Sequence, residues 1–333
     1  MKIVIPMAGR GTRLRPHTLT VPKPLIPIAG KPIVHRLVED IVELCNEPVD
    51  EIGFIIGDFG DEVEKQLHDI AESVNSKAKI FYQKEKLGTA HAILCAKEVL
   101  EGNVIVAFAD TLFKADFSID QTKDGVIWTQ KVEDPRAFGV VKVNESGNIT
   151  DFVEKPEEFV SDLAIIGIYY FKDGAYLRDE LQYLIDNDIK DKGEYQITNA
   201  LDNMKNKGSK FAPGTVKEWL DCGNKDVTVN TNQRYLEFIK DKDLVSSSAE
   251  ISNSTIIEPV FIGEGVKISN SVIGPHVSVG ENSEISHSVI ENSIIQQNAS
   301  LSNVNLENSM IGNFVEIKKQ PEDLSVGDYN VIK

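Results

Sequence analysis

The sequence has few of the features that mark disulfide-rich, zinc-binding or membrane proteins. Its 333 residues include only three cysteines, Cys45, Cys95 and Cys222, which are scattered and odd in number. This spacing argues against a disulfide framework and against a zinc site. No run approaches the roughly twenty apolar residues that span a bilayer, and the opening MKIVIPMAG is too short for a signal peptide. We therefore expect a cytoplasmic protein without a membrane partner.

Basic residues are also scarce, because 35 lysines and arginines face 52 aspartates and glutamates and give a formal net charge of -17. Such a surface repels nucleic acid, so no nucleic-acid partner is expected. Against this background, the stretch AGRGTRLRPHTLTVPKPLIPIAGKP (residues 8–32) concentrates three arginines and two lysines around spaced glycines. Glycines let backbone N–H groups approach a ligand, and the cations indicate that this ligand is a small anion.

The first part of the chain alternates short β-branched runs with longer stretches at helical spacing. The runs KIVIP, EIGFIIG, KIFYQ and VIVAFAD are separated by IVHRLVEDIVELC, DEVEKQLHDIAESV and TAHAILCAKEVL. This order predicts a Rossmann-like α/β domain with a mostly parallel sheet covered on both faces, over residues 1–243. Ligands of such sheets bind at the carboxyl ends of the strands, where the glycine loop and FAD both lie.

Residues 247–333 follow a different rhythm, with aliphatic residues five or six positions apart. The positions are Ile251, Ile256, Ile262, Ile268, Ile273, Val279, Ile285, Ile290, Ile295, Leu301, Leu306, Ile311 and Ile317. Neither a helix nor a flat strand keeps that spacing on one face. It predicts a solenoid of hexapeptide repeats, a parallel β-helix of about four coils. Such a surface favours self-association, so we expect a homo-oligomer.

The basic stretch resembles the signature of the sugar-1-phosphate nucleotidyltransferases, the nucleoside-diphosphate-sugar pyrophosphorylases. The resemblance continues in order through LGTAHA, FAD, DPRAFGVV, VEKP, GEYQITNAL and WLDCGN, and it covers about residues 1–240. The repeats resemble the left-handed β-helix of longer members. The resemblance implies a Mg²⁺-dependent enzyme whose substrates are a nucleoside triphosphate and a sugar 1-phosphate.

The resemblance also assigns roles in the basic stretch. Arg13 and Lys23 would be the catalytic cations that activate the triphosphate and stabilise the departing pyrophosphate. The backbone around the glycines would cradle the phosphates, through Ala8, Gly9, Gly11 and Thr12. Phosphoryl and nucleotidyl transfer needs positioning and charge neutralisation more than a nucleophilic side chain.

Two carboxylates, Asp110 of FADTLF and Asp221 of WLDCGN, are the expected magnesium ligands by the same resemblance. Hard oxygen ligands, few in number and completed by phosphates, suit Mg²⁺. Ala109 and Asn224 depart from the residues that the family often has beside these aspartates, but neither departure removes a carboxylate.

The sugar phosphate is expected to bind residues of several further motifs. By resemblance, Lys155 of VEKP binds its phosphate and Glu154 binds sugar hydroxyls. The backbones of Gly139 and Ile165 line the sugar pocket, and Glu194 either contacts substrate or organises its loop.

Base recognition is expected from YQKEKLGTAHAI, where Gln83 resembles the glutamine that pairs with a pyrimidine edge, with Gly88 and Thr89 beside the base. An amide both donates and accepts, as uracil and thymine require. An exposed glutamine at a strand end remains the alternative. We therefore expect dTTP or UTP with glucose 1-phosphate.

Three rival functions remain open at this level. The first is a mannose-1-phosphate guanylyltransferase, and the second is a non-catalytic subunit that binds a nucleotide sugar. The third is an acyltransferase activity of the β-helix through His276 or His287, although a histidine in a solvated turn is the favoured interpretation of both.

Overall fold

The computed structural model describes residues 1–9, 11–45, 47–115 and 119–332. The chain divides into two compact units. The first unit holds Met1–Ile26 and Lys31–Gly223, and the second holds Pro27–Gly30 and Asn224–Lys333. The chain therefore enters the second unit twice, first for a short excursion and then for its whole carboxyl-terminal part. The boundary expected from the sequence, between residues 243 and 247, stays a prediction.

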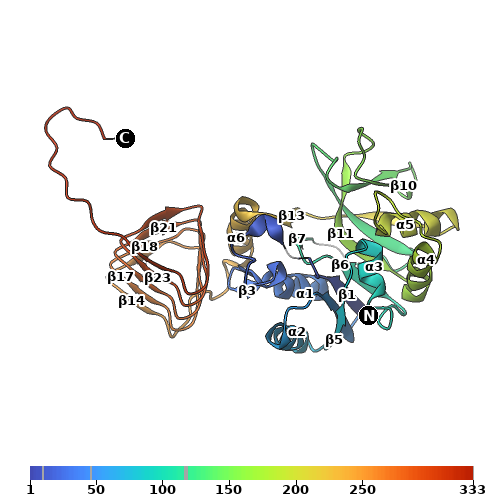
Figure 1. The fold of residues 1–333 in the computed structure, drawn as a ribbon, viewed down its shortest axis with the longest axis horizontal. Coiled ribbons are helices and arrows are strands. Elements are labelled where there is room, and N and C mark those ends of the chain that lie inside the picture. Colours follow the sequence, from blue (N-terminus) through green and yellow to red (C-terminus); the bar gives the residue numbers. More distant parts are fainter. Residues whose placement is uncertain (10, 46, 116–118, 333) are drawn as a thin grey trace. The chain divides into compact units, whose positions relative to one another are not determined.

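The first unit is built on a nine-stranded mixed sheet with the order β10-β9-β11-β6-β1-β4-β5, to which β8 and β12 are added through β11 (Figure 1). Its strands are β1 (Lys2–Pro6), β4 (Glu51–Ile56), β5 (Lys77–Tyr82), β6 (Val104–Ala107), β8 (Gly125–Lys131), β9 (Gly139–Val143), β10 (Ile149–Glu154), β11 (Leu163–Phe171) and β12 (Phe211–Thr215). Strands β5, β4, β1 and β6 are parallel. Their carboxyl ends therefore meet at one edge of the sheet.

The other half of this sheet is mostly antiparallel, because β11 runs against β6, β8 and β9, although β12 is parallel to β8. Beside it, β7 (Thr111–Lys114) and β13 (Glu218–Asp221) form a separate two-stranded antiparallel ribbon. The sequence analysis predicted the parallel strands of this sheet, but it did not predict the antiparallel strand pairs. Short segments β2 (Pro27–Ile28) and β3 (Lys31–Pro32) precede the first long helix.

The helices form where apolar residues recur at helical spacing. They are α1 (Ile33–Leu44), α2 (Asp61–Ser73), α3 (Thr89–Leu94), α4 (Gly174–Asp186) and α5 (Ile197–Asn206). Helices α1 and α2 pack together, and α3, α4 and α5 form another group. The core joins α3, α4 and α5 to apolar residues of the sheet such as Val4 and Val106. No helix in the described ranges is long and apolar enough to cross a membrane.

The second unit contains α6 (Lys225–Ile239) and a parallel β-helix of three stacked sheets. The strands are β14 (Glu250–Ser252), β15 (Thr255–Ile256), β16 (Val260–Ile262), β17 (Lys267–Ser269), β18 (Val272–Ile273), β19 (Val277–Val279), β20 (Glu284–Ser286), β21 (Val289–Glu291), β22 (Ile294–Ile295), β23 (Ser300–Ser302), β24 (Asn305–Glu307), β25 (Met310–Ile311) and β26 (Glu316–Lys318). Of the repeated aliphatic positions, all but Ile251 lie in its core or pack against it. Ile251 is 39% exposed because it belongs to the terminal coil.

Asparagine and serine pairs turn the corners of this β-helix. Asn253 and Asn270 both adopt positive φ, which asparagine tolerates better than most residues. Their side chains join coils 17 residues apart, with Asn253 Nδ2 donating to Asn270 Oδ1 at 2.6 Å. The buried Ser271 hydroxyl accepts the N–H of Ser288 in the next coil. The expected fold class is confirmed, because an α/β domain with a parallel-rich sheet is followed by stacked sheets of short parallel strands, consistent with a left-handed β-helix.

Candidate active site

The glycine loop after β1 is shaped by the close approach of Lys23. Gly11 has φ 61, and a Cβ atom at this position would lie 2.6 Å from Lys23 Cβ. A larger residue would therefore meet both backbone strain and a clash. The Thr18 hydroxyl donates to the Gly11 carbonyl at 2.7 Å. Beyond Gly11 the chain forms the 3₁₀ turn η1 (Thr12–Leu14), which the buried Leu14 anchors to the core.

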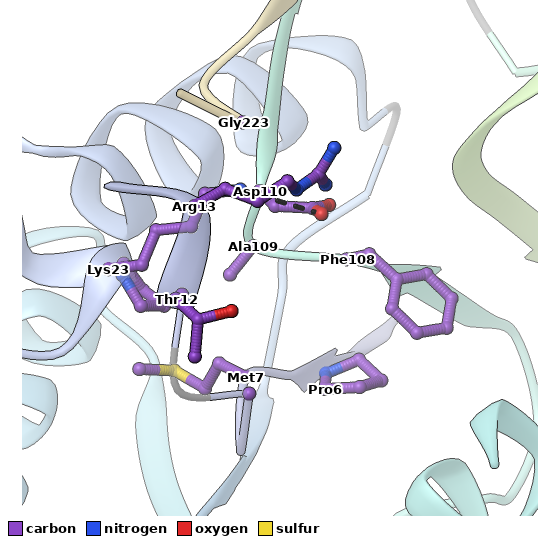
Figure 2. Close-up of a pocket in the computed structure, with 12 residues that line it drawn as sticks. Pro6, Met7, Thr12, Arg13, Lys23, Phe108, Ala109, Asp110 and Gly223 are labelled. Atoms are coloured by element: carbon purple, nitrogen blue, oxygen red, sulfur yellow. Dashed lines mark ion pairs between the residues drawn. The ribbon is translucent and has the colours of Figure 1, made fainter. Parts of the chain in front are cut away.

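This loop lines a cavity of about 320 Å³ at the carboxyl ends of β1 and β6. In Figure 2 the hydroxyl of Thr12 points toward the middle of the cavity, and the ring of Phe108 lies on the opposite side. The lining residues are Pro6, Met7, Gly9, Gly11, Thr12, Arg13, Lys23, Pro24, Phe108, Ala109, Asp110 and Gly223. Five of the predicted triphosphate residues and one predicted metal ligand therefore share one cavity. Ala8, the remaining triphosphate residue, precedes Gly9 and lies beside Gly57 at the end of β4.

Lys23 begins the 3₁₀ turn η2 (Lys23–Leu25) and is only 7% exposed. Its Nζ atom lies 3.6 Å from Asp110 Oδ2, whose side chain is 56% exposed. A buried ammonium requires a compensating charge, which Asp110 supplies. The cation is thus held at the cavity wall beside a carboxylate that solvent reaches.

Asp221 is brought next to this pair by the β7–β13 ribbon. It lies opposite Thr111, and the N–H of Cys222 donates to the Asp110 carbonyl at 3.2 Å. Burial raises the pKa of the Asp221 carboxyl, as does the charge of Asp110. Lys23 and Arg13 oppose these effects, as does a hydrogen bond from the Gly223 backbone. Two carboxylates and two cations therefore act on each other in one site.

A second cluster collects the predicted sugar-binding residues. Strands β9 and β10 place Gly139 opposite Glu154. A Cβ atom at Gly139 would lie 3.1 Å from Glu154 Oε2 and 3.3 Å from Ile165 Cδ1. Lys155 Nζ lies 3.5 Å from Glu154 Oε1, and Lys155 adopts φ 41 directly after β10. All four residues therefore meet at one place in the first unit.

The sequence analysis missed three residues of these clusters. The Thr198 hydroxyl donates to Glu154 Oε2 at 3.4 Å. Tyr169 is buried, which raises its pKa, and the charges of Glu154 and Asp110 raise it further. Phe108 stacks edge-on against Tyr169, with ring centroids 6.3 Å apart. The charges of carboxylates in both clusters therefore raise the pKa of Tyr169. Phe108 lies in the motif FAD and Thr198 in the motif GEYQITNAL, whereas Tyr169 lies in none of the motifs named above.

The third predicted group follows β5. Gln83 Nε2 lies 3.3 Å from the Gly88 carbonyl and 3.3 Å from His91 Nδ1. Gly88 has φ 112, and a Cβ atom there would overlap the backbone of Tyr195. The Thr89 hydroxyl accepts the N–H of Ile197 at 2.9 Å. Gly88 therefore packs against the backbone of Tyr195, and Thr89 is hydrogen-bonded to Ile197, so the segment after Gln83 lies against residues 195–197.

Three weaker candidates have structural partners of their own. Glu194 Oε2 accepts a hydrogen bond from Gln196 at 3.0 Å within its loop. His276 Nε2 lies 2.7 Å from Glu237 Oε1, and His287 lies 3.4 Å from Asn270 Nδ2 at a corner of the β-helix. Both histidines have positive φ and occupy turns. Nothing in these contacts favours acyl transfer.

Comparison with known proteins identifies the family of this chain. The model of a family described as nucleotidyl transferase matches residues 2–237. A glucose-1-phosphate thymidylyltransferase of Streptomyces griseus is 28% identical over 97% of this chain and 95% of its own length. The low-salt glycan biosynthesis nucleotidyltransferase Agl11 of Haloferax volcanii is 32% identical over 75% of this chain and 71% of its own length.

Two further matches cover only part of one of the two chains compared. The bifunctional protein GlmU of Methanococcus vannielii is 31% identical over 80% of this chain, but the match spans only 62% of that protein. Among solved structures, a UDP-glucose pyrophosphorylase complexed with UDP-glucose has a TM-score of 0.59 and 25% identity. That match covers 71% of this chain and 98% of the pyrophosphorylase.

Proposed function

The chain belongs to the nucleotidyl transferase family, and we propose that it is a sugar-1-phosphate nucleotidyltransferase that couples dTTP or UTP to glucose 1-phosphate. The resemblance seen in the sequence is confirmed at the level of the family. The preference for these substrates rests on Gln83 and on the similarity to a glucose-1-phosphate thymidylyltransferase and a UDP-glucose pyrophosphorylase. The choice of these two substrates is more specific than membership of the family.

The observation that carries the proposal is the cavity shared by the glycine loop, Arg13 and Lys23. An oxygen of the sugar phosphate attacks the α-phosphorus of the nucleoside triphosphate, and the bond to pyrophosphate breaks. At an effective dielectric of 20, two unit charges 4 Å apart interact by about 4 kcal/mol, so the phosphates repel strongly without compensation. Lys23 and Arg13 offset this charge, and the backbone N–H groups of the loop orient the triphosphate.

The donor set also fits magnesium, which we assign to Asp110 and Asp221. Burial raises the pKa of the Asp221 carboxyl, as does the charge of Asp110, and a divalent cation held by the two carboxylates would offset their repulsion. Within the described ranges, no group of three or more His, Cys, Asp or Glu side chains is arranged to hold a metal ion. A cation here would therefore need phosphate oxygens to complete its shell, which suits Mg²⁺. When bound, the ion would supply charge neutralisation to the phosphates.

The second cluster supplies the sugar phosphate site. Glu154 accepts hydrogen bonds from sugar hydroxyls, and Lys155 offers a cation to the phosphate because its side chain is about half exposed. Glycine at position 139 leaves room beside the Glu154 carboxylate. Gln83 recognises the pyrimidine edge once it releases the Gly88 carbonyl or His91.

The test is pyrophosphate release with Mg²⁺ over a grid of five nucleoside triphosphates and four sugar 1-phosphates. The triphosphates are dTTP, UTP, GTP, CTP and ATP, and the sugars are glucose, N-acetylglucosamine, mannose and galactose 1-phosphates. The expected maximum is dTTP or UTP with glucose 1-phosphate. A maximum with GTP and mannose 1-phosphate would replace the substrate assignment. No release with any pair would favour a non-catalytic subunit. The cytoplasmic location and the homo-oligomeric state remain predictions.

A further inference from the structure

The segments that carry Lys23 and Asp221 lead into the second unit within four residues, at Pro27 and Asn224 respectively. The chain passes into that unit after Ile26, for the excursion Pro27–Gly30, and again after Gly223. The proposed catalytic cation and a proposed metal ligand therefore both lie just before a crossing point. Contacts within the second unit therefore act on chain that is directly joined to both residues.

The excursion has a strained backbone that the second unit holds in place. Ala29 adopts φ 48 and Gly30 adopts φ 85. A left-handed conformation costs an L-residue such as alanine about 1–2 kcal/mol, so other contacts must maintain it. Ala29 is fully buried, and its N–H donates to Asn232 Oδ1 at 2.9 Å.

Asn232 joins the excursion to the β-helix. It lies on α6 and is fully buried. Its Oδ1 atom also accepts the Ser278 hydroxyl at 2.7 Å, and its Nδ2 atom lies 3.5 Å from the His276 carbonyl. A buried amide that loses such partners is costly, so this connection resists rearrangement.

Phe261 of β16 provides a second contact on the excursion. Its ring packs directly on Gly30, where any Cβ atom would overlap the ring carbons. Glycine is thus required at position 30 both by its positive φ and by this ring. The aromatic ring and the asparagine amide together fix two successive residues of the excursion.

Backbone hydrogen bonds carry this constraint back to the catalytic lysine. The Ile33 N–H donates to the Ile26 carbonyl at 3.0 Å and closes the base of the excursion. The Ile26 N–H donates to the Lys23 carbonyl at 3.0 Å. The chain that leads from the excursion back to Lys23 is therefore short and closed by hydrogen bonds.

We propose that Phe261 and Asn232 are positioning residues for the nucleotidyl transfer, because they hold the excursion Pro27–Gly30 and thereby fix Lys23 against the triphosphate. This inference rests on the proposed function. It gives the β-helix a role in turnover in addition to the self-association expected from the sequence.

The test compares Phe261→Ala with Phe314→Ala in the full-length protein. Phe314 is the matched control, because it belongs to the same unit but is 78% exposed. Misplacing a catalytic group by a fraction of an ångström lowers turnover, so kcat should fall about tenfold in Phe261→Ala. The KM for the sugar 1-phosphate should be unchanged, and Phe261→Leu should recover most of the loss. Equal kcat values for the two alanine variants would overturn the proposal.

A double-mutant cycle identifies the residue through which Phe261 acts. In a Lys23→Met background, Phe261→Ala should have no further effect on kcat, because the group it positions is gone. Independent losses that multiply would mean that Phe261 only stabilises the fold, and this would contradict the proposal.

Hydrogen exchange provides a readout that does not depend on activity. Amides of residues 23–30 should exchange faster in Phe261→Ala than in Phe314→Ala, and unchanged protection would overturn the positioning role. If wild-type protein releases no pyrophosphate with any substrate pair, the proposed function fails, whereas this exchange measurement still tests the positioning. The two failures are therefore distinguishable.

A second substitution probes the same contact from the other side. Gly30→Ala should lower kcat more than Gly147→Ala, which has a similar positive φ but no neighbour within 4 Å. Adding Phe261→Ala removes the overlapping ring and should restore part of the activity. An effect of Gly30→Ala no larger than that of Gly147→Ala would count against the proposal.

Discussion

The ammonium group of Lys23 lies 3.6 Å from the carboxylate of Asp110, and the two groups differ sharply in exposure. The lysine stem is buried against Gly11, whereas the carboxylate is open to solvent. This pair fixes a cation where a triphosphate would enter and leaves the carboxylate accessible to a metal ion. The separate roles of the two residues lead to separate predictions.

Lys23→Met should lower kcat by about 100- to 1,000-fold, as removal of one stabilising donor does in other active sites. Methionine retains an unbranched stem that can pack against Gly11 but loses the charge. The measurement is steady-state pyrophosphate release with saturating substrates. Lys97→Met, at an exposed position, is the control. Near-normal activity in a folded Lys23→Met protein would refute the catalytic role of this lysine.

Asp110→Asn should lower magnesium-supported turnover by about 100-fold or more, since the neutral amide is a poor ligand for Mg²⁺. Addition of EDTA to the wild-type enzyme should have the same effect, reversed by excess Mg²⁺. Asp69→Asn, on the exposed side of α2, serves as the control. Full activity in EDTA would remove magnesium from the mechanism.

Much of the architecture could be predicted because its signals are local. The parallel half of the sheet follows from β-branched runs such as that of β1, and the β-helix follows from its repeated aliphatic positions. The glycine loop was predictable because Gly11, Arg13 and Lys23 lie close together in sequence. These features are set by residues within a few positions of each other.

The remaining features depend on pairing between distant segments, which periodicity does not encode. Asp221 reaches Asp110 only because β13 pairs with β7. Tyr169 packs against Phe108 because β11 runs against β6, and its own neighbours in sequence give no sign of this. Likewise, no pattern in Pro27–Gly30 indicates that it belongs with the β-helix, because Asn232 and Phe261 supply that contact.

Glu154→Gln should raise the KM for the sugar 1-phosphate about tenfold or more and change the KM for the nucleotide much less. The amide keeps the shape beside Gly139 but accepts weaker hydrogen bonds from sugar hydroxyls than a carboxylate does. The measurement is steady-state kinetics with each substrate varied in turn. Equal effects on both KM values would argue that Glu154 only organises the fold.

Gln83→Ala should reduce the discrimination between dTTP or UTP and GTP by about tenfold, because one bidentate amide contact to a base contributes on the order of 1–3 kcal/mol. The comparison is the ratio of kcat/KM values for the three triphosphates. His91→Ala is a useful companion, since it removes a neighbour of Gln83 Nε2 without removing the amide. An unchanged ratio in Gln83→Ala would leave this residue as an ordinary polar residue at the end of β5.

The contact between α6 and the β-helix predicts a pH dependence of stability. Glu237 Oε1 lies 2.7 Å from His276 Nε2, and this hydrogen bond, with help from Lys240, lowers the pKa of the Glu237 carboxyl. Because the folded pKa is lower than the unfolded value near 4.5, the stabilisation is present above pH 4.5 and is lost as the pH falls through the folded pKa. Glu237→Gln should therefore lower the free energy of unfolding by about 0.5 kcal/mol at pH 7, as expected for a partly exposed pair.

Urea denaturation of the wild type and the variant across this range measures the effect. The difference between the two proteins should shrink as the pH is lowered below 4.5. In a His276→Gln background it should be smaller, because only Lys240 is then left to pair with the Glu237 carboxylate. A difference that stays constant with pH would mean that Glu237 stabilises the second unit by packing. In that case its charge would contribute nothing to holding α6, and with it Asn232, against the β-helix.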